Sequence, residues 1–381
     1  MKDLFQLDPK ISYLNCAYMS PNLRTVEVAG MEGIMMKRNP AHLKTAHFFE
    51  PAEAVKRSFA KLIQADDPQR IAIVPSVSYG ISIVARNLSL HKGDEIVLTG
   101  EQFPSNVYPW QRLAAESGAK IVMVAAPDQR DGRGKGWNER ILDAIGEKTR
   151  LVAMGHVHWT DGTLFDLSAI RAKSKVFDAA LVIDGTQSVG ALPFSVRDIQ
   201  PDALVIGAYK WMLGPYGMGL AYFGEKFDQG IPLEENWLNR KGSEDFSRLV
   251  EYAEDYQPMA QRFEVGQRSN LVNLLMMQTA LNQLHQWPPN LIQDHGEKLI
   301  QSIQEDVLAL GCWIEAPEWR ASHLFGIHVP SGTSASELKE HLMAENIFVS
   351  VRGTAVRVGP HLYNDENDMR RLLRVFTKMI S

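Results

Sequence analysis

A carboxylate and a lysine follow two neighbouring apolar runs in the segment LVIDGTQSVGALPFSVRDIQPDALVIGAYKWMLGPYGMGLAYF, residues 181–223. Asp184 ends the first run, and Lys210 follows the second. Because open α/β sheets bind ligands at the carboxyl ends of parallel strands, we expect both side chains at one edge of a sheet. Small and aromatic residues flank Lys210, and a shielded lysine loses its proton more easily, as Schiff-base chemistry requires. The alternative is a salt bridge at the sheet rim.

The framework that positions this pair is predicted by short apolar runs that alternate with amphipathic stretches. The candidate strands cover residues 70–74, 95–99, 120–124, 151–155, 180–184 and 203–207. The candidate helices between them cover residues 77–87, 104–117, 138–145 and 167–177. This alternation predicts an α/β fold with parallel strands and helical crossovers. The run 218–223 predicts a further strand, which we place at the edge of the sheet.

A second, smaller domain is predicted after a polar, Trp-containing stretch at about 230–259. A long helix at 270–286 stops at a Pro-Pro pair. The elements expected beyond it are a helix, a strand at 323–329, a helix at 334–346, strands at 348–351 and 355–358, and a helix at 366–379. We therefore expect a large domain at 20–287 and a small α+β domain at 288–381, with residues 1–19 packed on the small domain.

Length and composition exclude several classes of protein. The 381 residues suffice for two or three domains, and 45% hydrophobic with 22% charged residues is ordinary for a globular chain. The net charge of −5 argues against a broad surface for nucleic acid or an acidic membrane. The two cysteines, Cys16 and Cys312, exclude a disulfide framework and an all-cysteine metal site, and no metal is expected. The sequence has neither a signal-type apolar core at its N-terminus nor a membrane-length apolar run, so we expect the cytoplasm.

The Asp-x-x-Gln strand end, Asp184 and Gln187, followed by Lys210, resembles the fold-type I pyridoxal-phosphate enzymes. More narrowly, the chain resembles the class V aminotransferases, which include cysteine desulfurases, isopenicillin N epimerase-like enzymes and kynureninases. The resemblance runs from YLN at 13–15 to RVGPHLYN at 357–364. It implies a large, mostly parallel sheet domain with a small C-terminal domain, and a pyridoxal 5′-phosphate cofactor joined to Lys210. The motifs are more specific for the cofactor than for the reaction.

The resemblance implies three residues around the cofactor ring. Asp184 would keep the pyridine nitrogen protonated, so that the ring can withdraw electrons. Gln187 would donate a hydrogen bond to the ring 3′-oxygen. Phe103, in EQFPSNVYPWQ, would stack on the ring face; the alternative is an aromatic residue of the core.

The resemblance also implies how the cofactor phosphate is held. The amides of Val77 and Ser78 and the Ser78 hydroxyl would bind it at a helix N-terminus. Tyr209 would donate its hydroxyl to the same phosphate. Gln267, in FEVGQRSN, would reach the phosphate of a neighbouring subunit, which implies a homodimer with a shared active site.

Substrate contacts are expected in the segment SVRGTAVRVGPHLYND, residues 350–365. The resemblance implies that Arg357 clamps the α-carboxylate of an amino-acid substrate in a bidentate fork, with Arg352 and Asn15 as further substrate-binding residues. The alternative is two solvated arginines on a hairpin. In HVHWTDGTLFDL, His158 and Trp159 should lie near the ring, where His158 is either catalytic or a structural hydrogen-bonding group.

The absence of a cysteine nucleophile limits the reactions that this chain is expected to catalyse. Cysteine desulfurases carry a nucleophilic cysteine on a small-domain loop, but no cysteine lies between Arg352 and Arg357, and neither Cys16 nor Cys312 matches the position. We therefore expect an aminotransferase-type reaction. The alternatives are a lyase or hydrolase at the β-position, of C–S lyase or kynureninase type, and a non-catalytic pyridoxal-phosphate-binding protein.

Two further expectations concern specificity and the competing fold. Asn236, Trp237 and Arg240, in NWLNRKG, are candidates to contact the substrate side chain. A nicotinamide-binding Rossmann enzyme is disfavoured, because LGPYGMG at 213–219 lacks the G-x-G-x-x-G spacing after a first strand.

Overall fold

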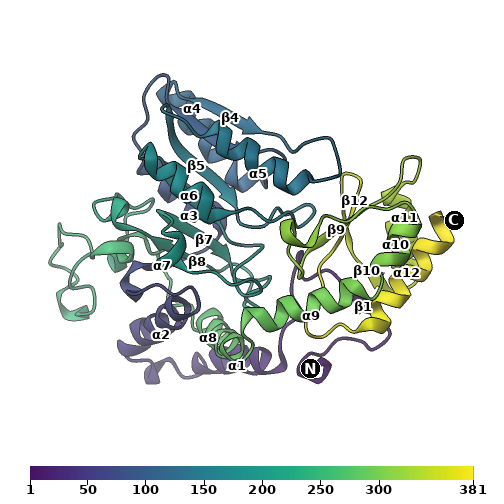
Figure 1. Cartoon of the computed structure of the whole chain (residues 1–381). Coiled ribbons are helices and arrows are strands. Elements are labelled where there is room, and N and C mark those ends of the chain that lie inside the picture. The colour runs from purple at the N-terminus through teal and green to yellow at the C-terminus, as the bar shows by residue number, and fades with distance from the viewer. Residues whose placement is uncertain (381) are drawn as a thin grey trace.

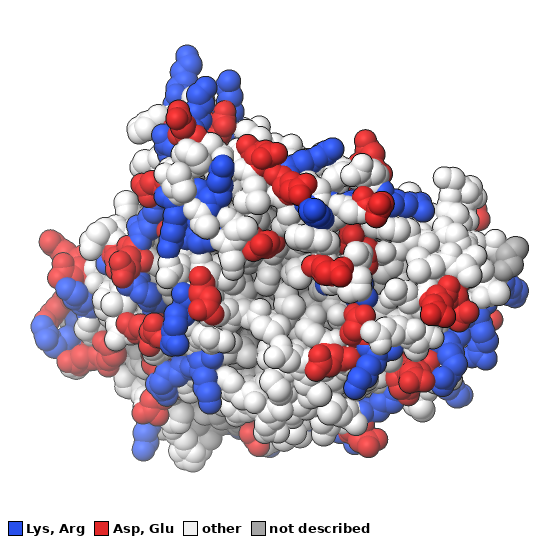
Figure 2. Space-filling model, in the orientation of Figure 1, with Lys and Arg blue, Asp and Glu red and all other residues white. Residues whose placement is uncertain are grey.

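The computed structural model describes residues 1–380. Figure 1 shows a large lobe built around a twisted sheet and a smaller lobe that contains the C-terminal helices, with the N-terminal segment beside the smaller lobe. No helix among the described residues is long and apolar enough to cross a membrane. Figure 2 shows basic and acidic side chains interspersed over one face of the molecule.

The large sheet has seven strands in the order β2-β8-β7-β6-β5-β3-β4. Their bounds are β2 (Ile71–Val74), β3 (Glu95–Thr99), β4 (Lys120–Val124), β5 (Thr149–Gly155), β6 (Ala180–Asp184), β7 (Ala203–Gly207) and β8 (Gly219–Phe223). All neighbours pair in parallel except β8, which is antiparallel to both β2 and β7. The predicted α/β fold is confirmed. The prediction that 218–223 forms an edge is wrong, because β8 inserts between β2 and β7.

Helices cover both faces of this sheet. They are α1 (Arg24–Met36), α2 (Ala46–Leu62), α3 (Val77–Arg86), α4 (Tyr108–Ser117), α5 (Arg133–Ala144), α6 (Leu167–Val176), α7 (Val196–Ile199) and α8 (Leu271–Gln286). Side chains of a strand alternate between two apolar cores: Val152 and Met154 face one, and Leu151 and Ala153 face the other. The second core contains α3 and α4, and the first contains α2, α5, α6 and α8. A strand buried on both faces explains the uninterrupted apolar runs in the sequence.

The small domain has its own apolar core. Its antiparallel sheet has the order β11-β12-β9, formed by β9 (Phe325–His328), β11 (Ser350–Arg352) and β12 (Ala355–Val358). Its helices are α9 (Pro289–Gln301), α10 (Gln304–Ala309), α11 (Ala335–Ala344) and α12 (Glu366–Ile380). Near the N-terminus, β1 (Ser12–Tyr13) pairs in parallel with β10 (Ile347–Phe348), and Leu14 lies in the small-domain core. The first residues of the chain therefore lie against its last domain.

Gly190 allows the loop after β6 to approach the segment after β7. Its φ of +100° lies in the region that favours glycine, and an added Cβ would lie 2.4 Å from the Trp211 carbonyl oxygen. This close approach fixes the backbone position of Trp211, which follows Lys210 in the sequence.

We predict that Gly190→Ala lowers the free energy of unfolding by about 2 kcal/mol or more, because it adds a steric clash to the cost of positive φ. Gly93→Ala is the matched control, since Gly93 has a φ of +96° with nothing within 4 Å of its added Cβ. It should cost only about 1 kcal/mol. Denaturant unfolding of both variants measures the difference. Equal losses would show that the contact with Trp211 is unimportant.

Candidate functional site

Asp184 and Lys210 line one cavity of about 250 Å³ at the carboxyl ends of β6 and β7. The strands pair in parallel, with Asp184 opposite Val205, and Lys210 follows β7 after a turn through Tyr209. The sequence prediction that places both side chains at one edge of the sheet therefore agrees with the geometry.

Lys210 is a buried amine with a strongly shifted acidity. Burial, together with the positive charge of Arg357, lowers its pKa to about 8, while Asp184 opposes the shift. The Lys210 Nζ lies 5.8 Å from the centre of the Phe103 ring and 5.5 Å from that of Tyr209. An amine with this pKa is partly unprotonated near neutral pH, which is the form that attacks an aldehyde.

The pKa of the Asp184 carboxyl group is also shifted by its surroundings. Burial raises the pKa of its carboxyl group, whereas hydrogen bonds from Thr186 and the charge of Lys210 counteract this rise. The Thr186 amide donates to Asp184 Oδ1 over 3.0 Å. A carboxylate held at a strand end in this way suits the protonated nitrogen of a pyridine ring.

Gln187 is fixed at the floor of the cavity by two hydrogen bonds. Its Nε2 donates to the Ala17 carbonyl oxygen over 3.1 Å, and its Oε1 accepts from Trp211 Nε1 over 2.9 Å. Because an amide nitrogen carries two hydrogens, the second remains for an oxygen in the cavity. The Trp211 contact also ties Gln187 to the residue that follows Lys210.

The N-terminus of α3 forms another wall of the cavity. Ser76 caps this helix, with its Oγ accepting from the Tyr79 amide over 3.2 Å. Val77 and Ser78 follow the cap and line the cavity. The free amides of a first helical turn bind anions, so a phosphate fits this end.

Aromatic rings form the mouth of the cavity. Phe103 is 40% exposed and packs edge-on against Trp159, with ring centres 5.4 Å apart. Tyr209 packs against Tyr216 at 4.7 Å, and both line the cavity. With the helix N-terminus, Asp184 and Lys210, these rings fit the phosphate, nitrogen, aldehyde and faces of pyridoxal phosphate.

Several lining residues were not predicted from the sequence: Pro75, Ser105, Thr186, Tyr216, Gly217 and Met218. Thr186 stands inside the DGTQ motif, and Tyr216 with Gly217 stands in the turn after Lys210, so proximity to motif residues was an available signal.

Arg357 and Arg352 lie behind Trp159 and do not line the cavity. Arg357 is 1% exposed; its Nη1 donates to the Trp159 carbonyl oxygen over 2.8 Å, and its Nη2 donates to Ser350 Oγ over 3.3 Å. Asn15 accepts a hydrogen bond from Ser350 Oγ over 2.9 Å. Asn15 therefore positions Arg357 through Ser350, although it also lies outside the cavity lining.

The surroundings of Arg357 lower the pKa of its guanidinium group. Burial and the neighbouring Arg352 lower the pKa of Arg357 to about 9, and burial also lowers that of Arg352. The two guanidinium groups repel each other, so a negative charge placed between them would be stabilised.

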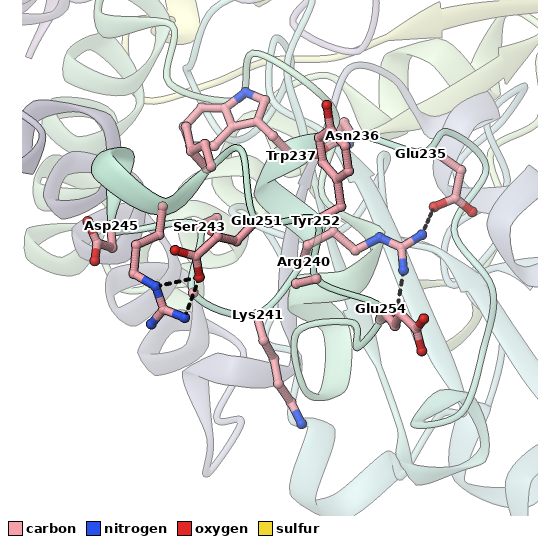
Figure 3. Close-up of a pocket in the computed structure, with 14 residues that line it drawn as sticks. Glu235, Asn236, Trp237, Arg240, Lys241, Ser243, Asp245, Glu251, Tyr252 and Glu254 are labelled. Carbon is pink, nitrogen blue, oxygen red and sulfur yellow. Dashed lines mark hydrogen bonds and ion pairs between the residues drawn. The ribbon is translucent and has the colours of Figure 1, made fainter.

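The proposed substrate-reading residues Asn236, Trp237 and Arg240 are not in the Lys210 cavity of the same chain. They line a larger cavity of about 750 Å³ within the loop after β8 (Figure 3). Arg240 is ion-paired with Glu235 and donates to the Glu254 carbonyl oxygen, as Figure 3 shows. Within one chain the long loop folds on itself, and the contact of these residues with a substrate side chain stays a prediction.

Gln267 also lies away from this cavity. It is exposed and has a φ of +61°. Its neighbours are fixed by a buried ion-pair network, in which Glu264 contacts Lys56 over 3.3 Å and Arg268 over 2.7 Å. Gln267 is thus an exposed residue beside a buried ion-pair network.

His158 has the geometry of a structural residue. Its Nε2 lies 3.1 Å from the Gly100 carbonyl oxygen, and its Nδ1 lies 2.7 Å from Thr160 Oγ1. Both ring nitrogens are thus engaged. Cys16 and Cys312 are buried, and burial raises the thiol pKa to about 12 and about 11, so neither resembles a reactive thiolate.

Comparison with known proteins identifies one family and several similar sequences. The model of the aminotransferase class-V family matches residues 34–375. The uncharacterized aminotransferase YcbU of Bacillus subtilis is 27% identical over 325 residues, covering 85% of this chain and 82% of YcbU. A cysteine desulfurase of an Enterobacter species is 26% identical over 359 residues, covering 92% of this chain and 84% of the desulfurase.

Solved structures share the fold. The Escherichia coli cysteine desulfurase CsdA superposes with a TM-score of 0.84 at 20% identity, covering 99% of this chain and 97% of CsdA. A C-DES mutant with glycine covalently linked to its pyridoxal-phosphate cofactor gives a TM-score of 0.86 at 21% identity, covering 100% and 99%. The C-DES protein is described as a cystine C–S lyase.

We predict that pyridoxal phosphate added to the apoprotein attaches with a rate that rises with pH and is half-maximal near pH 8. The unprotonated amine reacts, and the lowered pKa of Lys210 supplies it well below the usual value of about 10.4. Stopped-flow measurement of the visible absorbance gives the profile. Lys210→Ala is the control and should show no covalent attachment. A rate that keeps rising to about pH 10 would contradict the lowered pKa.

Proposed function

We propose that this chain, which belongs to the aminotransferase class-V family, transfers the amino group of an α-amino acid through Lys210 and Asp184. It is a pyridoxal-phosphate-dependent enzyme that acts on an amino acid. The observation that carries the proposal is the buried Lys210 amine, with its pKa of about 8, in one cavity with Asp184.

Each residue has a distinct task in this reaction. When bound, the cofactor supplies an aldehyde that links to the amino group and a ring that accepts electrons from the α-carbon. Lys210, as a free amine, would remove and return the proton at the α-carbon of the substrate. Asp184 would hold the proton on the pyridine nitrogen, and Phe103 would cover the ring face. Val77 and Ser78 would hold the phosphate through the N-terminus of α3.

A lyase that cleaves at the β-position is the second candidate. Cysteine desulfurases are among the relatives, and C-DES, a cystine C–S lyase, has a similar fold. The β11–β12 hairpin turns through Gly353 and Thr354, so it offers no thiol to receive sulfur. This favours transamination, or elimination without a cysteine nucleophile, over persulfide transfer.

Product analysis separates the two reactions. Holoenzyme is incubated with single amino acids, with and without a keto-acid acceptor, and keto acid, ammonia, sulfide and the amino form of the cofactor are measured. Transamination yields keto acid and the amino form of the cofactor without ammonia, and turnover requires the acceptor. Ammonia or sulfide release without an acceptor would favour the lyase, and no product from any amino acid would contradict both.

The active enzyme is proposed to be a homodimer. Helix α1 presents an apolar stripe at helical spacing, with Val28, Met31 and Ile34 each more than half exposed, and such a stripe fits a second copy of this chain. Gln267 is exposed beside the ion-pair network and would reach the phosphate of the other subunit. Light scattering should give twice the chain mass. Two buried, unpaired thiols suit a reducing compartment, so we propose the cytoplasm.

We predict that Asp184→Asn slows turnover by roughly 10²- to 10⁴-fold, because the amide cannot keep the pyridine nitrogen protonated. Asparagine keeps the size of the side chain, so the fold should be retained. Steady-state kinetics and the fraction of bound cofactor measure the two effects separately. A rate within tenfold of wild type would rule out the role of Asp184 on the ring nitrogen.

A further inference from the structure

Two guanidinium groups beside Trp159 lack a carboxylate partner. Within residues 1–380, no acidic side chain lies within ion-pair distance of Arg352 or Arg357. The Nε atom of each is buried and has no hydrogen-bond partner there. Arg357 is a buried, unpaired cation, which is costly, and Arg352 is partly buried beside it, so this arrangement is suited to bound anions.

Arg357 is held rigidly. The Trp159 carbonyl oxygen accepts from its Nη1, and Ser350, itself bonded to Asn15, accepts from its Nη2. These neutral acceptors orient the guanidinium without neutralising it. The α-carboxylate is common to all amino-acid substrates, and a fixed guanidinium suits a group with a constant position.

Arg352 is held differently. It ends β11 at the tip of the hairpin, is only partly buried, and its Nη1 donates to the neighbouring Val351 carbonyl oxygen over 2.7 Å. Its guanidinium carbon lies 5.0 Å from the centre of the Trp159 indole, whose ring reaches the cavity wall. Arg352 therefore lies nearer to solvent and has room to follow a variable group.

Among the described residues, Asp184 is the one carboxylate that lines the cavity, and it accepts from the Thr186 amide and faces Lys210. The cofactor phosphate is assigned to the N-terminus of α3. A substrate carboxylate bound to Arg357 would leave Arg352 without an acidic partner, so Arg352 is available for a second negative charge.

We propose that Arg352 binds a second carboxylate, on the side chain of the substrate, while Arg357 binds the α-carboxylate, so that the preferred substrates are acidic amino acids. This proposal rests on the proposed function, because it assumes that the amino group of the substrate reaches the cofactor. It assigns Arg352 to specificity, with the Trp159 ring as the surface on which its guanidinium lies.

Unreactive ligands test the two-carboxylate site without chemistry. Calorimetric titration of the holoenzyme compares succinate with butyrate and glutarate with pentanoate, which are matched in chain length. Each dicarboxylate should bind roughly tenfold or more tightly than its partner, since hydrogen bonds to charged groups are strong. In Arg352→Gln the ratio should fall to about one. Equal affinities in the wild type, or an unchanged ratio in Arg352→Gln, would overturn the proposal.

Amino acids matched in size test the same site during chemistry. L-aspartate is compared with L-asparagine, and L-glutamate with L-glutamine, by the spectral change of the bound cofactor. The acids should react at concentrations roughly tenfold or more below the amides, and Arg352→Gln should abolish this preference. If the amides react as well as the acids, the second carboxylate site is wrong while the proposed function stands. If no amino acid changes the spectrum, the proposed function itself fails.

Arg374→Gln is the matched control for charge. Arg374 is exposed on α12 of the same domain, so its loss changes the net charge equally but removes no guanidinium from the site. The dicarboxylate preference should be unchanged in this variant. A similar fall in both variants would assign the effect to overall charge and overturn the role of Arg352. Arg352→Lys should retain part of the preference, because it keeps the charge but loses the planar fork.

Discussion

The parallel pairing of β6 with β7 is the constraint on which the cofactor site depends. It brings the end of β6, with Asp184, beside the turn that carries Lys210. Two contacts lock the following segments together: Gly190 lies against the Trp211 backbone, and Gln187 accepts from the Trp211 indole. A slip of one residue between the strands would turn every strand side chain to the opposite face and separate the acid from the amine. The electron-accepting chemistry is therefore built at the end of the sheet, where His323 Nε2 lies 2.7 Å from the Gln187 carbonyl oxygen.

The substrate side depends on contacts that are distant in the sequence. Asn15 follows β1, which pairs with the small domain, and it accepts from Ser350 on β11. Ser350 in turn orients Arg357 on β12, whose other bond goes to Trp159 of the large domain. The N-terminal segment, the hairpin and the loop after β5 thus form one connected unit. The hairpin is also coupled to the Lys210 site, because the positive charge of Arg357 helps to lower the pKa of Lys210.

The sequence predicted the parts of the structure that local patterns determine. Strands β3, β4, β6 and β7 were predicted with their observed bounds. Strands β3, β6 and β7 are continuous apolar runs because they are buried on both faces, whereas β4 is an edge strand that is partly exposed. Strand order is a long-range property, which explains why β8 was wrongly placed at an edge. Helices α1 and α2 were not predicted, and α1 carries exposed apolar residues that blur its periodicity. No pattern in the sequence shows that the charges of the loop with Arg240 pair within the loop.

Three other buried cations of this protein are each paired with an acid, and the contrast supports a ligand role for Arg357. Lys56 and Arg268 are fully or almost fully buried, and both are paired with Glu264. Arg320 is paired with Glu297, whereas Arg262 is buried without an acid among the described residues and donates to the Gly230 carbonyl oxygen. An unpaired buried charge costs stability. Arg357 is more deeply buried than Arg262, and its hydrogen-bond acceptors are neutral. The missing charge is therefore most simply supplied by the substrate, whose carboxylate would complete the pairing only when it binds.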